Sequence, residues 1–461
     1  KSLVDKGNLV EEWARKLFPD GVLITESDEE ALRVTQEYIT EKKHVIFQSK
    51  FIHDKFLAKN DVLEYDKFND CWNLYEIKGT NTLDENVREI DHVEDATFQT
   101  IILRAKGIKV GKVFIIHLNK EYVREDEINV EELFVKDDIT EEVKNREEFT
   151  KEKMHKAAEC LFQQNEQALV CQCVYSGRSA HCATFKYSYP DIPEYSVHDL
   201  SRIGNSKKKL ESLVDSQIFD ISEIPEEFEL TPNQKNQVFT HKTQRPMIDL
   251  IAIKKELQSL SYPLYFLDYE TYPPAIPLFN GFKPYQQIPF QFSLHVLNEP
   301  GGELTHAEYL HEEASDPSLD VITQLKKTIG SNGHVITWNK RFEKGINSQM
   351  AERNPEHADF LESVNDRIYD LMDIFQKQFY VHHGFKGKVS IKKVLPVLVP
   401  KLSYKDLEIK EGGSAMEAWY EMVFNTETQE EKLKIAKDLR TYCGLDTYAM
   451  YAIWKELINI V

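Results

Sequence analysis

The amino-acid sequence predicts a mixed α/β protein of two domains, and three observations support this prediction. The chain has 461 residues, whereas a single domain usually holds about 100–200. Short apolar runs typical of strands alternate with longer amphipathic stretches typical of helices. Apolar residues make up 41% and charged residues 29%, a composition typical of soluble globular proteins. We place the domain boundary near 220–260, where polar residues and proline suit a connector.

In the N-terminal half, apolar periodicity predicts helices at 11–16, 28–42 and 93–106, with exposed helix and loop over 124–159. Alternation of apolar and polar residues predicts strands at 44–56, 62–65, 72–78 and 111–118. In the C-terminal half, a connector over 219–244 precedes helices expected at 247–260, 316–329, 342–353 and 428–457. The strands expected among them lie at 264–269, 289–296 and 335–338.

Charge, cysteine content and hydropathy restrict the classes of function. The net charge is −20, and a field of that sign repels polyanions. A role with nucleic acid therefore requires a local basic patch or carboxylates neutralised by metal ions. Six cysteines are too few for a secreted disulfide framework, and we expect a cytoplasmic protein. The apolar run at 394–399 is far shorter than the roughly 20 residues that span a bilayer, so we expect no membrane partner.

An acidic pair follows the apolar strand at 264–267. Asp268 and Glu270 are two residues apart, and a strand's period of two places them on the same face. Two such anions repel one another unless a cation lies between them. Oxygen ligands of this kind suit Mg²⁺ or Mn²⁺.

Two later segments extend this pattern. The strand 335–339 leads into a helix whose first turn carries Glu343, and Tyr442 and Asp446 lie four residues apart on one helix face. The order Asp-x-Glu, Asn-x-x-Phe-acid and Tyr-x-x-x-Asp, over about residues 261–461, resembles the DEDD 3′→5′ exonucleases of the RNase H-like fold, Tyr subtype.

That resemblance implies that Asp268, Glu270, Glu343 and Asp446 hold two Mg²⁺ or Mn²⁺ ions about 4 Å apart. Tyr442 would orient the attacking water or help deprotonate it. The second motif of these exonucleases usually carries Asp, whereas here it is Glu343. The expected substrate is DNA with single-stranded 3′ ends. An RNA 3′ exonuclease is an alternative, because a DEDD site does not itself select the sugar; a nucleic-acid-binding scaffold with one or both sites inactive is another.

A basic stretch at 376–405 contains seven lysines and no acidic residue. Its candidates for binding nucleic acid are Lys386, Lys388, Lys392 and Lys393. Tyr404 lies in the same stretch, and its ring is a candidate for stacking on bases. The alternative is an ordinary lysine-rich surface loop.

A second acidic constellation lies near the N-terminus. Asp61 directly precedes the strand 62–65, and Glu76 and Lys78 share one face of the strand 72–78. Asp61 and Glu76 are candidate catalytic ligands of Mg²⁺, and Lys78 could position or activate water. A cross-strand surface salt bridge is the alternative.

The surroundings of this constellation resemble the RecB-like PD-(D/E)XK nucleases. The resemblance implies a second nuclease activity that uses one or two Mg²⁺ or Mn²⁺ ions. Gln99 matches the glutamine motif of that family, although Leu103 stands where the family often has Tyr. An upstream acid or histidine often completes such a site, and the sequence leaves three candidates open: Glu11, Glu12 and His53.

Many RecB-like proteins also carry a [4Fe–4S] cluster on one upstream cysteine and three downstream ones. Cys171, Cys173 and Cys182 could be those three, and the first would precede Lys1 or be replaced by Cys160. His181 keeps Zn²⁺ open, and reduced free thiols are the other alternative.

Taken whole, the chain resembles a bacterial family that fuses a RecB-like nuclease to a DEDD exonuclease. We therefore expect a RecB-like restriction-endonuclease core at 1–155 and a Cys-containing segment at 156–215 that completes it. A connector at 216–260 and an RNase H-like exonuclease domain at 261–461 would follow. The resemblance does not identify a protein partner.

Overall fold

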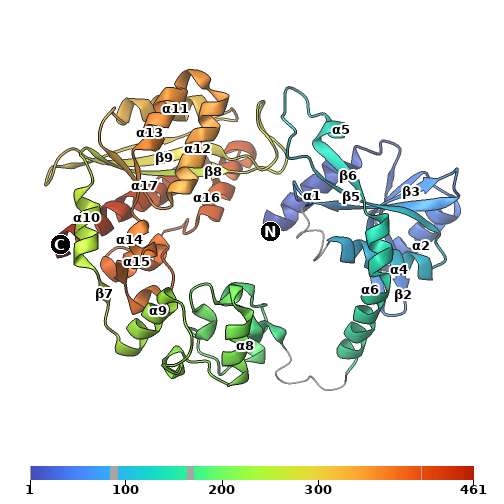
Figure 1. Ribbon diagram of the computed structural model, residues 1–461. Helices are drawn as coiled ribbons and strands as arrows, with labels where there is room; N and C mark the ends of the chain where they lie inside the picture. The colour runs from blue at the N-terminus through green and yellow to red at the C-terminus, as the bar shows by residue number, and fades with distance from the viewer. Residues whose placement is uncertain (1, 84–91, 164–170, 406) are drawn as a thin grey trace. The chain divides into compact units, whose positions relative to one another are not determined.

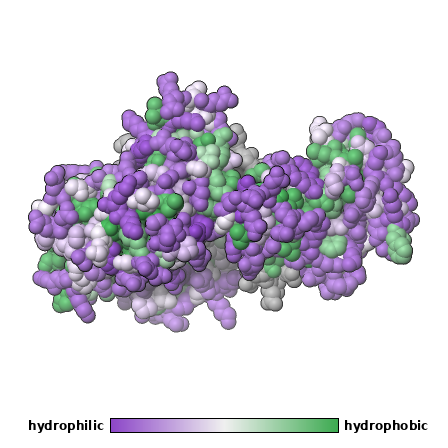
Figure 2. All heavy atoms as spheres, turned by 90° about the horizontal axis from the view of Figure 1, so that it is seen from above, coloured by the Kyte–Doolittle hydropathy of each residue, from purple (hydrophilic) through white to green (hydrophobic). Residues whose placement is uncertain are grey.

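The computed structural model describes residues 2–83, 92–163, 171–405 and 407–461 (Figure 1). Its internal contacts divide the chain into unit 1, residues 1–166 and 273–287, and unit 2, residues 167–272 and 288–461. Each unit combines helices with a mixed sheet, which confirms the predicted α/β class. The face shown in Figure 2 is mainly hydrophilic with scattered hydrophobic side chains. Within the described residues, we find no helix with the length and hydropathy needed to span a bilayer.

Unit 1 is built on a six-stranded sheet in the order β1-β2-β3-β4-β5-β6. Its strands are β1 (Val22–Leu23), β2 (Val45–His53), β3 (Phe56–Asp66), β4 (Cys71–Lys78), β5 (Val110–Leu118) and β6 (Phe134–Asp138). The pairs β1–β2 and β4–β5 are parallel, and the other neighbours are antiparallel. The helices are α1 (Ser2–Arg15), α2 (Asp28–Thr40), α4 (Val93–Ala105), α5 (Val130–Leu133) and α6 (Thr140–Leu161).

Alternating strand positions supply an apolar core on each face of this sheet. Leu63 and Leu74 pack with residues of α2, α4 and α6 on one face. Val62 and Tyr75 pack with Val10 of α1 on the other face. Since side chains on a strand alternate between faces, Glu76 and Lys78 share the face of Leu74, which α4 covers.

The segment 273–287 joins two strands of unit 2 in sequence but packs within unit 1. Ile276 is 4% exposed and lies in the same core cluster as Val10. The Arg124 guanidinium donates a hydrogen bond of 3.0 Å to the Pro277 carbonyl oxygen. The Tyr285 hydroxyl donates to the carbonyl oxygen of Gly79, the residue that follows β4. Unit 1 is therefore assembled from two separate stretches of the chain.

The larger sheet of unit 2 has the order β10-β9-β8-β11-β12. Its strands are β8 (Leu264–Tyr272), β9 (Ile288–Leu297), β10 (Leu304–Leu310), β11 (His334–Thr337) and β12 (Ile368–Asp370). The first three are antiparallel, and β11 runs parallel to both β8 and β12. Three helices, α11 (Ser318–Thr328), α12 (Lys340–Arg353) and α13 (Ala358–Asp366), cover one face, and α17 (Gln429–Ile460) covers the other (Figure 1).

The alternation along β8 decides which residues face α17. Tyr265, Leu267 and Tyr269 pack in the core beneath α11, α12 and α13. Phe266 points the other way, and its ring contacts Trp454 of α17. Asp268 continues the register of Phe266 and therefore also faces α17.

The remaining α-helices and strands described in unit 2 are α7 (Phe185–Ser188), α8 (Lys207–Asp215), α9 (Pro232–Thr243), β7 (Met247–Ile248), α10 (Leu250–Gln258), α14 (Asp373–Gln376), β13 (Tyr380–Val381), α15 (Ile391–Leu398) and α16 (Gly412–Tyr420). The Cys-containing segment has a core of its own, in which Leu210 and Leu213 of α8 are fully buried. We expected the segment 156–215 to complete the first domain; residues 156–166 group with unit 1, whereas residues 167–215 group with unit 2.

Several predicted elements are confirmed, among them the helices at 93–106 and 428–457 and the strand at 264–269. The predicted strand 44–56 was wrong in extent, because a tight turn at Asp54, with φ of 51°, divides it into β2 and the start of β3. Strands β6 and β10 were not predicted. The predicted helix 247–260 begins only at Leu250, and the predicted connector 219–244 contains α9.

Candidate functional site

The acidic cluster of unit 2 is formed by residues that lie far apart in sequence. Asp268 and Glu270 come from β8, and Asp446 comes from α17. An oxygen of Asp268, an oxygen of Glu270 and the Sγ atom of Cys443 all lie within 4.8 Å of one another. Burial, followed by the charge of Asp446, raises the pKa of Asp268 well above its usual range. Burial, followed by the charge of Asp268, raises the pKa of Glu270 well above its usual range. Burial raises the pKa of Asp446 to about 6.

Glu343 in the first turn of α12 interacts with this group through the charge of Asp268. Among the described residues, neither Glu343 nor Asp446 belongs to the set of ligand atoms that lie within 4.8 Å of one another. The Glu343 side chain is 1% exposed, and its Oε2 atom has no hydrogen-bond partner among the described residues. Burial, followed by the charge of Asp268, raises its pKa well above the usual range. Asp370 accepts hydrogen bonds from the backbone N–H groups of Asn339 and Lys340, at 3.0 and 2.9 Å. Asp370 thereby caps α12 and fixes the turn that carries Glu343.

Tyr442 lies beside these acids and is held by a lysine. The Lys392 Nζ atom donates to the Tyr442 hydroxyl oxygen at 3.3 Å and to the Lys410 carbonyl oxygen at 2.6 Å. Tyr404 is 8% exposed, and its hydroxyl donates to Asp446 Oδ1 at 2.6 Å. We expected Tyr404 to stack on bases, and this was wrong, because its ring is buried and its hydroxyl binds a site carboxylate.

The four candidate lysines differ in their surroundings. Lys392 lies next to the acidic cluster. Burial has the largest effect on the pKa of Asp446 and raises it, while the Tyr404 hydrogen bond and then the charge of Lys392 lower it by smaller amounts. The others are exposed on the surface: Lys386, Lys388 and Lys393. Sequence reasoning grouped all four as nucleic-acid ligands, and the contact between Lys392 and the Tyr442 hydroxyl was not foreseen.

The structure also brings together the predicted residues of unit 1. Glu76 and Lys78 extend from the same face of β4, and Lys78 Nζ donates to Glu76 Oε1 at 2.8 Å. The same ammonium donates to Asp95 Oδ2 of α4 at 2.6 Å. Asp61 of β3 is anchored by the backbone N–H of Ile77, which donates to its Oδ2 atom at 2.8 Å.

Gln99 of α4 contacts this group directly. Its Nε2 atom donates to Glu76 Oε2 at 2.7 Å, and its Oε1 atom accepts a hydrogen bond of 2.8 Å from Asn60. Leu103, one turn later, is fully buried in the apolar core and offers no polar atom to the group.

The geometry distinguishes the three upstream candidates. Glu11 of α1 accepts a hydrogen bond of 2.5 Å from Gln48 Nε2, which also donates to Asp61 Oδ1 at 3.1 Å. Glu12 is exposed, and His53 pairs with Asp54 at the hairpin turn. Glu11 is therefore the upstream acid connected to the group. Sequence reasoning missed Gln48, because a glutamine in a strand gives no chemical signal.

Burial shifts the acid–base properties of the unit 1 group. Burial, with a smaller contribution from the charge of Asp61, raises the pKa of Glu76 to about 8. Burial and the charge of Glu11 raise the pKa of Asp61 to about 6, against the opposing hydrogen bond from Ile77. Burial lowers the pKa of Lys78, but the interactions with Glu76 and Asp95 together outweigh burial, and the net shift is upward. The ammonium therefore stays charged between acids that repel one another.

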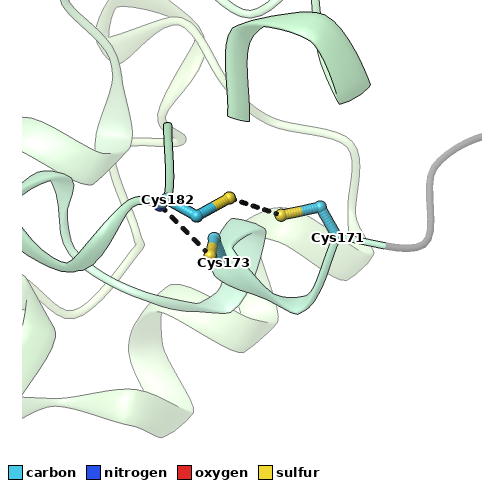
Figure 3. Close-up of side chains that lie close together, drawn as sticks. All are labelled: Cys171, Cys173 and Cys182. Atoms are coloured by element: carbon cyan, nitrogen blue, oxygen red, sulfur yellow. Dashed lines mark hydrogen bonds between the residues drawn. The ribbon is translucent and has the colours of Figure 1, made fainter. Parts of the chain in front are cut away.

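Three cysteines gather in the Cys-containing segment (Figure 3). The Sγ atoms of Cys171 and Cys182 are 3.4 Å apart, and the backbone N–H of Cys182 donates to Cys173 Sγ at 3.4 Å. Hydrogen bonding, chiefly from Thr184, lowers the pKa of Cys182 to about 7, and burial raises that of Cys171 to about 11. Cys160 is exposed on α6 of unit 1, and its role as a replacement for an upstream ligand stays a prediction.

His181 precedes Cys182, and we considered it as a zinc ligand. Its Nε2 atom lies 3.0 Å from the Ser176 carbonyl oxygen, and its ring stacks on Phe185 with centroids 3.6 Å apart. The imidazole is therefore engaged with the protein at one nitrogen and one face.

Comparison with known proteins gives similarity without a named activity. Residues 265–390 match a family described as "Domain of unknown function (DUF2779)". This stretch includes Asp268, Glu270 and Glu343 but ends before Tyr442 and Asp446. No solved structure matches the chain.

The chain is also similar to proteins from Mycoplasma and Ureaplasma. It is 25% identical to "Uncharacterized protein MG366" of Mycoplasma genitalium over 298 residues, which cover 60% of this chain and 42% of that protein. It is 28% identical to "Uncharacterized protein UU173" of Ureaplasma parvum over 254 residues, covering 49% and 35%. The identity to the Mycoplasma pneumoniae homologue of MG366 is 25% over 218 residues, covering 43% and 33%. The chain spans less than half the length of the curated relatives it matches.

Proposed function

We propose that the chain is a metal-dependent nuclease that removes nucleotides from DNA 3′ ends at the acidic cluster of unit 2. The observation that carries this proposal is that four buried carboxylates from β8, α12 and α17 act on one another through their charges, with every pKa raised. Buried like charges repel one another unless a cation lies between them. The motif order resembles the DEDD exonucleases, and the sheet order β10-β9-β8-β11-β12 supports an RNase H-like fold.

The residues present fit divalent cations. The Oε2 atom of Glu343 is buried without a partner in the described part of the chain, and the other three acids also offer oxygen donors. Such donors suit Mg²⁺ or Mn²⁺ rather than softer metals. The Cys443 thiol lies within 4.8 Å of Asp268 and Glu270, but burial and these acids raise its pKa well above the usual range, so it stays protonated and is not a ligand. Asp268, Glu270, Glu343 and Asp446 would hold the ions. When bound, two such ions lower the pKa of an attacking water and stabilise a leaving 3′ oxygen.

The neighbouring side chains have roles that follow from their contacts. Tyr442 would orient the water, because its hydroxyl lies beside the acids and its oxygen is held by Lys392. Tyr404 would keep the carboxylate of Asp446 in one rotamer through its hydrogen bond. The three exposed lysines of this region would attract the phosphate backbone of a single strand: Lys386, Lys388 and Lys393.

We assign a second nuclease site to unit 1. The element order α1, β2, β3, β4, α4, β5 supports a RecB-like core, and the acids lie on its central strands. Asp61 and Glu76 would hold one or two divalent ions. Lys78, bonded to Glu76 at 2.8 Å, would position the attacking water or stabilise charge that develops on the phosphate.

A structural metal site is proposed for the Cys-containing segment. Three sulfur ligands within 4.8 Å of one another fit part of a [4Fe–4S] cluster or a zinc site, each of which takes four ligands. Cys171, Cys173 and Cys182 would be three of the four. Iron and zinc analysis of the purified chain would distinguish a cluster from zinc and from free thiols.

The function is tested with Asp268→Ala and Glu76→Ala, separately and together, on 3′- and 5′-labelled single strands of DNA and RNA with Mg²⁺ or Mn²⁺. We expect Asp268→Ala to slow release of 3′ nucleotides from DNA at least a hundredfold, and Glu76→Ala to remove a second cleavage pattern. Glu12→Ala and Glu352→Ala are matched controls, because both carboxylates are exposed.

Each other outcome points to a specific alternative. Equal or faster degradation of RNA would favour the RNA exonuclease. If the unaltered chain retards labelled strands in a gel but neither substitution changes cleavage, the chain is a binding scaffold with inactive sites.

A further inference from the structure

The backbone of Gln48 adopts a conformation unusual for its place in a strand. Its φ is 59°, in the left-handed region that side chains other than glycine seldom adopt. In the β2–β3 ladder, Phe47 pairs with Val62 and Ser49 pairs with Asn60, but Gln48 between them forms no ladder pair. This break in the ladder coincides with the site, because the residue across from Gln48 is Asp61.

The side-chain pattern of β2 also changes at this residue. Val45 and Phe47 belong to the core cluster beneath α1, whereas Ile46 belongs to the cluster beneath α4. Beyond Gln48, the odd-numbered Phe51 lies in the cluster of Ile46. The reversal removes Gln48 from the normal alternation and turns its side chain toward the acidic group.

The amide of Gln48 joins two acids that come from different elements. Its Nε2 atom donates to Glu11 Oε1 of α1 at 2.5 Å and to Asp61 Oδ1 of β3 at 3.1 Å. Two N–H donors placed between two carboxylates offset the repulsion between them without adding a charge. Glu11 Oε1 also accepts a hydrogen bond of 3.1 Å from Arg15 Nη1 within α1. Gln48 therefore supplies the contact that directs Glu11 toward Asp61, while Arg15 holds it along its own helix.

Gln48 carries two unfavourable features that the fold does not require. Gln48 is 6% exposed, and its Oε1 atom has no hydrogen-bond partner among the residues described. A buried acceptor without a partner is unfavourable, as is the left-handed backbone. Glycine would satisfy the turn without either cost. Strain of this kind persists most often at functional sites.

We infer that Gln48 is a positioning residue of the unit 1 site, where it holds Glu11 and Asp61 toward one divalent cation. The inference rests on the nuclease activity proposed for Asp61, Glu76 and Lys78. It adds Glu11 to the acids of that site and explains why α1, on the opposite face of the sheet from α4, contributes a carboxylate. The substrate is a DNA phosphodiester cleaved with Mg²⁺ or Mn²⁺.

The decisive variant is Gln48→Gly in the full chain, with Asp268→Ala and Asp446→Ala present to silence the other site. Glycine adopts the required φ freely, so the turn is retained while the amide is lost. We expect cleavage by unit 1 to fall about 10–100-fold, as for other residues that orient metal ligands. The Mn²⁺ concentration for half-maximal binding, measured from the spin-resonance signal of free Mn²⁺, should rise by a similar factor.

Asp54→Gly in the same background is the matched control. Asp54 also has a positive φ, of 51°, but it is exposed at the hairpin turn. We expect its cleavage rate and Mn²⁺ binding to equal those of the parent. Should Gln48→Gly fail to fold, Gln48→Met keeps the length of the side chain without its hydrogen-bonding groups, and the same losses are expected.

The outcomes separate this inference from the function on which it rests. If the parent cleaves DNA and loses Mn²⁺ binding on Glu76→Ala, yet Gln48→Gly cleaves and binds as the parent does, Gln48 serves only the backbone turn and the inference falls. If the parent neither cleaves DNA nor loses Mn²⁺ binding on Glu76→Ala, the site proposed for unit 1 is absent. In that case both the function and the role of Gln48 are overturned.

Discussion

Replacement of Glu343 by glutamine should stabilise the metal-free protein while it disables the exonuclease site. Glu343 is buried in the first turn of α12, and its neighbours Asp268 and Asp370 add negative charge. Its Oε2 atom has no partner in the described part of the chain. Glutamine has nearly the same volume but no charge, so the repulsion disappears while the packing is kept.

The size of the effect follows from a buried carboxylate without a compensating partner among the described residues. Burial and the nearby carboxylates raise the pKa of Glu343 well above its usual range, so the charged form is destabilised in the folded protein. Leaving a buried charge uncompensated costs about 3–5 kcal/mol. In the variant, a buried glutamine amide with incomplete hydrogen bonding itself costs about 2 kcal/mol, which offsets part of this gain in stability. The net gain of about 2 kcal/mol corresponds to a melting temperature about 4 °C higher.

The assay is thermal unfolding at pH 7.5, first in EDTA and then with Mg²⁺ or Mn²⁺. In EDTA we expect Glu343→Gln to melt above the parent, and with metal ions the order should reverse. An ion at 100 times its dissociation constant stabilises the parent by about 2.7 kcal/mol, and the variant should lose much of that increment. Glu352→Gln, an exposed position on the same helix, should change stability by less than about 0.5 kcal/mol. A variant that melts below the parent in EDTA, or keeps the full metal increment, refutes the reasoning.

Three further predictions concern other parts of the molecule. Tyr404→Phe removes the hydroxyl that donates to Asp446, so the exonuclease rate should fall about tenfold and stability should fall by about 1 kcal/mol. An unchanged rate in a labelled-strand assay would exclude a positioning role for Tyr404. Because the folded-state pKa of Glu76 is raised to about 8, chemical denaturation in EDTA should show stability falling between about pH 4.5 and pH 8, since the folded state binds more protons there. Glu76→Gln should flatten that slope, and a rise in stability over this range contradicts the assignment. Ile276→Ala should destabilise unit 1 by about 2–4 kcal/mol. Hydrogen exchange should become faster in β4 and β5 and stay unchanged in β8 and β9. The reverse pattern would contradict the packing of 273–287 within unit 1.

Short-range patterns in the sequence were sufficient to place the principal acids on their elements. The i and i+2 spacing of Asp268 and Glu270 correctly placed both on a strand, and the four-residue spacing of Tyr442 and Asp446 placed both on one helix. Within such elements the direction of a side chain follows from the local period. The hairpin acids of unit 1 were predictable for the same reason, since Glu76 and Lys78 are two residues apart on β4.

Residues that act through long-range contacts could not be predicted in this way. Tyr404 lies 42 positions from the carboxylate that it binds, and Gln48 lies 37 positions from Glu11. Neither residue type indicates a site, because tyrosine and glutamine occur widely in strands and loops. Their roles depend on how separate elements pack, which periodicity does not encode.

The domain boundaries were the hardest feature to predict because unit 1 is discontinuous. Segment 273–287 follows the strand of Asp268 and Glu270 directly, so sequence proximity assigned it to the exonuclease domain. Its prolines and apolar residues resemble an ordinary loop, and only the burial of Ile276 beside Val10 reveals that it completes the core of unit 1. A loop inserted into another domain is invisible to any pattern read within a short window.

The two acidic groups differ in how the protein compensates their charge, and this difference bears on their need for metal ions. In unit 1 the ammonium of Lys78 bonds directly to Glu76, so one acid is neutralised within the protein. In unit 2 the ammonium of Lys392 bonds to the Tyr442 hydroxyl and a backbone carbonyl, and it reaches the acids only through space. Burial outweighs the ammonium at Glu76, whose pKa still rises to about 8, while the pKa values of Asp268 and Glu270 rise well above their usual range. More of the unit 2 charge is therefore left for divalent cations to neutralise.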